Sequence, residues 1–167
     1  MSKFEEVTDD VVKMMDDLIK GDFPTIVNAR IKPLFFMKKK TSNGALVLGQ
    51  MCKATPILNY LTSGPSGDDG YNYIMFLDGN VYPSLDIADK KRLIRHELNH
   101  IFIDLDASNP YKVVGHEIED FFKEIEYNKE EPRWKERVFA IAESIYASED
   151  DEGKGKATDG QNEDEED

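Results

Sequence analysis

The stretch His96-Glu97-Leu98-Asn99-His100 reads H-E-x-x-H, and it lies inside a segment whose pattern predicts an α-helix. On a helix, residues four positions apart differ by about 40° around the axis and about 6 Å along it, so His96 and His100 would share one face. One metal ion could then meet both imidazoles, while Glu97 could reach a water molecule on that ion. In the H-E-x-x-H zinc motif the glutamate is the general base. We therefore predict His96 and His100 as metal ligands and Glu97 as the catalytic residue.

A catalytic zinc site usually has three protein ligands and one open position. His116 is the only other histidine in the chain, sixteen residues after His100 and at the predicted start of the next helix. We predict His116 as the third ligand and one Zn²⁺ per chain. Nearby carboxylates are alternative ligands, or could accept a hydrogen bond from the free ring N–H of His116; they belong to Glu117, Glu119 and Asp120.

The rest of the pattern predicts an α+β fold. Helices are expected over residues 8–21, from a cap at Asp86 through 87–102, over 115–127 and from Pro132 onward. Strands are expected within 23–37, where Pro33 indicates an edge strand or a break, and over 45–52 and 71–77. The last of these could border a substrate cleft or lie in the core. Residues 56–61 fit either a short helix or a strand.

The charge is unevenly distributed along the 167 residues. Ten acidic residues and two lysines lie between 148 and 167, so more than half of the formal net charge of −13 comes from this end. We predict one domain over 1–147 and a disordered acidic tail over 148–167. Such a tail could bind a basic partner. The acidic balance makes nucleic acid an improbable partner for the domain.

Cysteine content and the start of the chain point to a reducing compartment. Cys52 is the only cysteine, which excludes an internal disulfide. The first residues carry no apolar signal region, and no apolar run is long enough to span a membrane. We expect a cytoplasmic protein, in a bacterial or phage-infected host cytosol.

Several blocks resemble the family of putative phage metallopeptidases, a zincin group, over about residues 20–130. They are Asn28-Ala29-Arg30-Ile31, Val47-Leu48-Gly49-Gln50, the strand ending near Asp78, Leu93 to His100, and His116-Glu117-Ile118-Glu119-Asp120-Phe121. The last block is also similar to the region downstream of H-E-x-x-H in SprT-like proteases. The resemblance implies a zincin-like fold, with a small mixed or antiparallel sheet packed on an N-terminal helix and the active-site helix, followed by C-terminal helices. It also implies zinc ligands at His96, His100 and His116 and a base at Glu97.

These observations predict a zinc-dependent metallopeptidase that hydrolyses peptide bonds of a protein or peptide substrate through a zinc-activated water. Tyr111 and Tyr82 are candidates for stabilising the oxyanion, although tyrosines are more often structural. The alternative is a zinc-binding zincin scaffold that regulates a host protein without proteolysis. The presence of Glu97 favours the peptidase, because a binding protein needs no base. Metal-dependent action on nucleic acid is a third reading, and the acidic balance opposes it.

Overall fold

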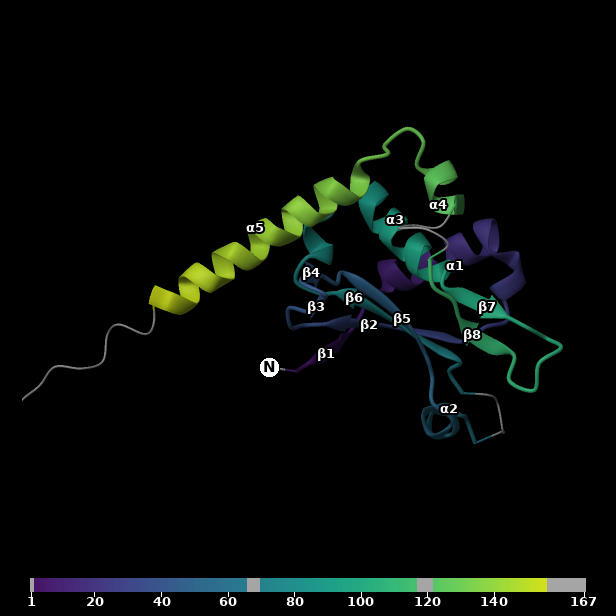
Figure 1. Ribbon diagram of the computed structural model, residues 1–167. Helices are drawn as coiled ribbons and strands as arrows, with labels where there is room; N and C mark the ends of the chain where they lie inside the picture. Colours follow the sequence, from purple (N-terminus) through teal and green to yellow (C-terminus); the bar gives the residue numbers. More distant parts are fainter. Residues whose placement is uncertain (1, 66–69, 117–121, 156–167) are drawn as a thin grey trace, which may run out of the picture.

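The computed structural model describes residues 2–65, 70–116 and 122–155, and within them the fold is α+β (Figure 1). The strands are β1 (Phe4–Glu6), β2 (Ile31–Phe36), β3 (Thr41–Ser42), β4 (Ala45–Leu46), β5 (Gly49–Lys53), β6 (Tyr73–Asp78), β7 (Ile101–Ile103) and β8 (Tyr111–Val113). The helices are α1 (Asp9–Asp22), α2 (Pro56–Thr62), α3 (Ile87–Leu98), α4 (Phe122–Tyr127) and α5 (Trp134–Gly155). Short 3₁₀ helices cover Pro24–Ile26 and Tyr82–Ser84.

A four-stranded mixed sheet in the order β1-β2-β6-β5 forms the centre of the molecule. β2 and β6 pair in parallel, with Ile31 opposite Tyr73, and β1 and β5 are antiparallel to their neighbours. The predicted strand over 71–77 is therefore internal β6, and the edge strand beside the metal-motif helix is β5. Pro33 lies in internal β2, but beyond the end of its pairing with β1, so its missing N–H interrupts no pairing with that strand.

Helices α1 and α3 lie together over one face of the sheet (Figure 1). The buried residues of α1 recur at helical spacing. Two acidic residues in its first turn interact favourably with the positive end of the helix dipole. α3 begins where the sequence predicts, because the Asp86 side chain accepts a hydrogen bond of 2.7 Å from the backbone N–H of Asp89. Local signals were thus sufficient to predict both helix starts.

The end of α3 differs from the prediction. The helix stops at Leu98 rather than continuing to Phe102, and Ile101 already pairs with Val113 in the β7–β8 hairpin. Asn99 closes the helix, with its backbone N–H donating to the carbonyl of Arg95 at 3.2 Å. A further bond from the backbone N–H of His100 to the carbonyl of Glu97 tightens the last turn. His100 thus lies just past the helix and still close to His96.

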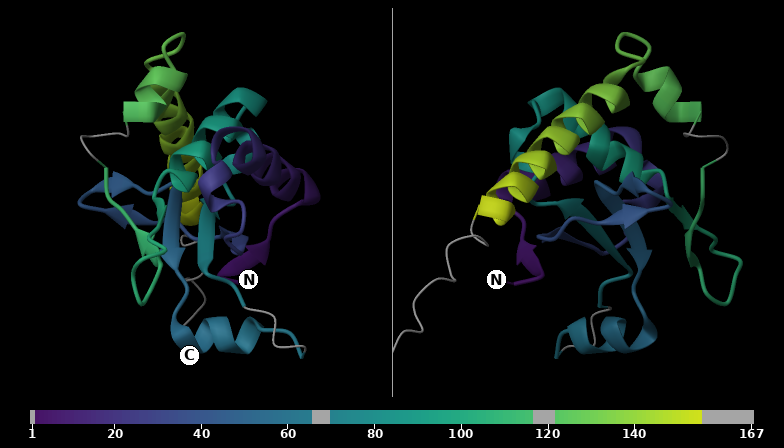
Figure 2. Two further views of the ribbon diagram at one scale, coloured as in Figure 1. Left: turned by 90° about the vertical axis from the view of Figure 1, so that its right-hand side faces the viewer. Right: turned by 60° about the vertical axis from the view of Figure 1, so that its left-hand side comes forward.

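Helix α5 is attached to the body through two buried carboxylates. The Tyr146 hydroxyl donates to Asp78 Oδ2 at 2.6 Å, and the Arg137 guanidinium binds Asp89 of α3 through Nε and Nη2. Figures 1 and 2 show α5 running from beside α3 past the β3–β4 hairpin. The predicted domain end at residue 147 falls inside this helix, which continues to Gly155, and residues 156–167 lie outside the described part of the chain.

None of the helices in the described residues is both long enough and apolar enough to cross a bilayer.

Candidate metal centre

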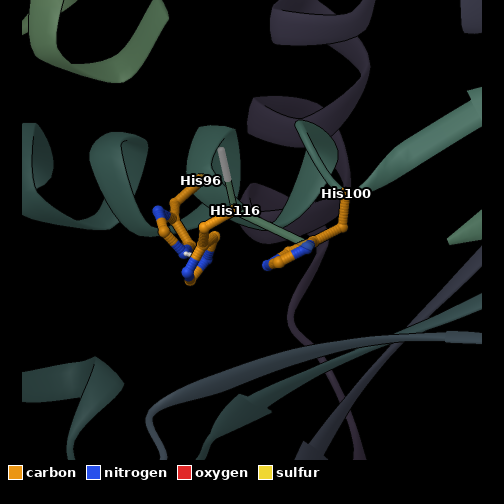
Figure 3. A group of neighbouring side chains, drawn as sticks. All are labelled: His96, His100 and His116. Atoms are coloured by element: carbon orange, nitrogen blue, oxygen red, sulfur yellow. Dashed lines mark hydrogen bonds between the residues drawn. The ribbon is translucent and has the colours of Figure 1, made fainter. Parts of the chain in front are cut away.

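The three histidines of the chain come together at one place (Figure 3). His96 lies on α3, His100 follows the end of that helix, and His116 follows β8. One ring nitrogen of each lies within 4.8 Å of the others, and the Nε2 atoms of His96 and His116 are 3.0 Å apart. Two nitrogen ligands of a tetrahedral zinc ion lie about 3.4 Å apart, so this spacing suits a single ion.

The β7–β8 hairpin explains how His116 reaches the site. The chain leaves His100, forms the two antiparallel strands and returns beside its starting point. The backbone N–H of Val114 donates to the His100 carbonyl at 2.8 Å, which closes the hairpin next to α3. His116, predicted at a helix start, lies instead in the non-helical segment after β8.

The orientation of His100 is set by the same hairpin. Its Nδ1 lies 2.6 Å from the carbonyl oxygen of Val114. Since a carbonyl only accepts, Nδ1–H must donate, and Nε2 then carries the lone pair that a metal needs. A backbone carbonyl behind a metal-binding histidine is a common way to hold the correct tautomer.

Glu97 follows His96 on α3 and is buried, with 4% of its surface exposed. Burial raises the pKa of its carboxyl to about 7, against the lowering effects of His96, a hydrogen bond from the Met51 backbone and the charge of Lys135. Its Oε2 has no hydrogen-bond partner among the described residues. Three imidazole nitrogens beside a buried carboxylate with an unused oxygen form a donor set that fits a zinc ion and its water.

Gly49, the first residue of β5, allows Glu97 to occupy this position. A Cβ atom at Gly49 would lie 2.9 Å from Cδ and 3.0 Å from Cγ of Glu97, closer than ordinary van der Waals contact. The absence of a side chain at residue 49 therefore lets the edge strand pass directly against the carboxylate. Gly49 was not among the predicted site residues, although a glycine inside a strand pattern often marks such a close approach.

A buried carboxylate on α4 accepts hydrogen bonds from the residues that directly precede His96 and His100. Glu124, which is fully buried, accepts from Arg95 Nε at 2.9 Å and from Asn99 Nδ2 at 3.1 Å. Arg95 precedes His96, and Asn99 precedes His100. Polar side chains are unusual beside a packed core. Arg95 and Asn99 are polar here because both donate hydrogen bonds to Glu124 on α4.

Two openings flank Glu97 and Gly49. One, of about 360 Å³, lies between the β4–β5 segment, α3 and α5, and its wall includes His96, Glu97 and His116. The other, of about 310 Å³, lies between β5 and the segment after β8 and includes His100. The candidate centre is thus reachable from two sides of the edge strand.

The remaining predicted candidates are placed as follows. Tyr82 is buried against Phe35, and Tyr111 packs edge-on against Tyr73; neither lines the two openings. The alternative ligands Glu117, Glu119 and Asp120 lie outside the described residues. Lys135, which the sequence did not single out, lines the larger opening and influences Glu97 electrostatically. Its location depends on the docking of α5, which no local signal indicates.

Comparison with known proteins places the chain in one family. The family model described as "Putative phage metallopeptidase" matches residues 2–146, which is most of the chain. No curated protein and no solved structure gives a significant match.

Proposed function

This chain belongs to the putative phage metallopeptidase family, whose description implies a metal and peptidase chemistry, and from that premise we propose a zinc-dependent peptidase. In this proposal His96, His100 and His116 hold the zinc, and Glu97 is the general base. The observation that carries it is the convergence of three histidine nitrogens beside a buried glutamate, one of whose oxygens has no hydrogen-bond partner among the described residues. The arrangement of the metal helix beside an antiparallel edge strand supports a zincin-like fold.

The donor set favours zinc among the common metals, because three neutral imidazoles suit it and leave one position open. A bound zinc ion would supply a Lewis acid that polarises the scissile carbonyl and lowers the pKa of a water molecule. The Val114 carbonyl holds His100 in the tautomer that presents Nε2. The chain's own residues thus prepare the site for a cation with three nitrogen ligands.

Glu97 is positioned to carry the proton. Its carboxylate is held by the backbone of Met51 and packs against Gly49, and Oε2 is left to accept a proton from the attacking water. The same oxygen can then pass the proton to the leaving amine. Burial keeps the carboxylate from being fully solvated, which favours proton transfer near neutral pH.

Zinc content is the first test. We expect about one zinc per chain in the purified protein, and loss of most of it in His96→Ala and His116→Ala, because the chain has no other histidine to substitute. Elemental analysis after dialysis measures this. Cys52→Ser is the control, since removal of the only thiol should leave the zinc in place. Full zinc content in His96→Ala would contradict the site.

Hydrolysis is the second test. Cleavage of an unfolded protein such as casein is expected to stop after treatment with a chelator and to return with one equivalent of zinc. The reason is that Glu97 alone cannot polarise the scissile carbonyl. Cleavage that persists in metal-free protein, with zinc shown to be absent, would contradict the proposed mechanism.

Gly49→Ala tests the contact between the edge strand and the base. The added methyl group would displace the Glu97 carboxylate, and a shift of about 1 Å can reduce turnover about 100-fold. Zinc content should be retained, because the three atoms nearest to the added Cβ all belong to Glu97 and none belongs to a histidine. Gly21→Ala, where a Cβ meets nothing within 4 Å, is the matched control. Equal activity of the two variants would show that the contact does not matter.

The physiological substrate in this proposal is a protein or peptide, encountered in the cytosol of a bacterium or an infected host. A basic partner for the acidic end of the chain remains a prediction.

A further inference from the structure

The larger opening beside the candidate metal centre has mostly apolar walls. It is bounded by Leu46 and Leu48 on the β4–β5 side and by Trp134, Val138 and Phe139 of α5. His96, Glu97 and His116 lie in the same wall, so the apolar surface begins directly at the proposed catalytic groups. The volume of about 360 Å³ is at the lower end of the range for ligand sites.

The apolar lining runs from the core to the surface. Trp134 and Val138 are 4% and 2% exposed, but Phe139 is 38% exposed, and Leu46 is half-buried. Exposed apolar side chains gathered around a concave polar site usually mark a surface that a ligand covers. A ligand bound to this surface would lie close to the Glu97 carboxylate.

The openings on the two sides of β5 have different linings, so they suit different parts of a substrate. The smaller opening, with β8 close beside β5, contains the aliphatic Met51, Val113 and Val114 among small and polar residues, and no Phe, Tyr or Trp of the described residues lines it. The larger opening has the aromatic and aliphatic walls. The α5 side therefore offers a large apolar side chain the more extensive apolar wall, with Trp134 and Phe139 in it.

We infer that the pocket between α5 and the β4–β5 segment binds the side chain of a substrate residue directly next to the scissile bond, and that it selects large apolar side chains. This inference rests on the proposed peptidase function. The residue must flank the scissile bond because Glu97 and two histidines are themselves part of the pocket wall. Burying the charge of a lysine or arginine side chain against these apolar walls would cost free energy, which disfavours both.

Cleavage sites in a peptide library test the selection. Sequencing the products by mass spectrometry should show leucine, methionine or phenylalanine at one fixed side of the cleaved bond, with lysine and arginine depleted there. Replacing that residue by alanine in a single peptide should lower kcat/KM at least 10-fold, since each buried methylene contributes substantially to discrimination. Cleavage without such a preference would overturn the inference and leave the peptidase proposal standing.

A pair of matched variants tests the location of the subsite. Phe139→Asp places a charge at the mouth of the pocket and should lower kcat/KM for apolar substrates at least 10-fold, with zinc content unchanged. Val12→Asp is the control, because Val12 is 37% exposed on α1 and lines neither opening. Equal effects of the two substitutions would overturn the assignment to this pocket.

The only tryptophan of the chain gives a readout that does not need turnover. Trp134 lines the pocket, so its emission should change saturably when zinc-loaded Glu97→Gln protein is titrated with the blocked peptide Ala-Ala-Phe-Ala-Ala. The all-alanine peptide should give no such change. If nothing is cleaved by the wild-type protein but this response is seen, the pocket assignment is supported and the peptidase proposal fails. If both peptides leave the emission unchanged, the inference is overturned.

Discussion

Glu97→Gln is expected to abolish peptide hydrolysis while the protein keeps its zinc. Glutamine has the shape of glutamate and can still pack against Gly49 and accept from the Met51 backbone, but its amide cannot take a proton from water. General base catalysis typically contributes a factor of about 10² to 10⁴, so the remaining rate should be at most about 1% of the wild type. Steady-state cleavage of casein and elemental analysis measure the two halves of this result.

The matched control for this experiment is Glu126→Gln. Glu126 lies on α4, and its side chain is 74% exposed in a pair with Lys129, so the same chemical change there should leave activity intact. Three outcomes separate the possible functions. Loss of cleavage with retained zinc supports the peptidase; full cleavage by Glu97→Gln contradicts the role of Glu97. Full biological activity of a variant that cannot cleave would favour the zinc-binding regulator instead.

Glu124→Leu is expected to cause the largest loss of stability. Glu124 is fully buried and accepts hydrogen bonds from Arg95, Asn99 and Asn128. Its removal leaves the Arg95 guanidinium, which is 10% exposed, without its carboxylate. Breaking a buried ion pair by deleting one partner typically costs about 3–5 kcal/mol. Urea denaturation of the metal-free protein should show a decrease of this size in the free energy of unfolding.

The same substitution should also weaken zinc binding. Glu124 holds the residues that precede His96 and His100, and α4 itself follows His116 in the chain, so its release removes support from all three histidines. Supporting groups behind metal ligands typically contribute about 10–100-fold in affinity, measurable by competition with a chelator. Glu126→Leu on the same helix is the control and should change neither quantity appreciably. Equal destabilisation by the two substitutions would contradict the role of the buried pair.

A double substitution distinguishes the stability lost by leaving a charge unpaired from the stability lost through altered packing. Arg95→Leu combined with Glu124→Leu removes both members of the pair, so no charge remains buried without a partner. The double variant should therefore be more stable than the sum of the two single effects implies. Strict additivity would show that the two side chains do not act as a unit.

Much of the site was predictable from short stretches of sequence. The start of α3 at Ile87 follows from the Asp86 cap, and the expected closeness of His96 and His100 is confirmed although His100 lies just past the end of the helix. These features depend on residues within about one helical turn of each other. The position of His116 near the other two histidines was also predicted, although its location after a β-hairpin was not.

Other features were not predictable because their partners are distant in the chain. The end of α3 at Leu98 depends on the pairing of Ile101 with Val113. The purpose of Arg95 and Asn99 is visible only once Glu124 lies beside them, 29 and 25 positions further on. The docking of α5, through Tyr146 and Asp78, brings Trp134 and Lys135 into the opening that Glu97 and His96 also line, across a still larger separation.

By itself, the sequence determined that an H-E-x-x-H motif follows a capped helix start, that one further histidine is present, and that the body around them is α+β. Helix caps, periodicity and ligand spacing are local properties of the chain, and they are readable without its fold. Only the tertiary structure decided which strand borders the site, that Gly49 makes room for Glu97, and that α5 forms an apolar wall beside it. These depend on contacts between segments far apart in the chain, which sequence periodicity does not specify.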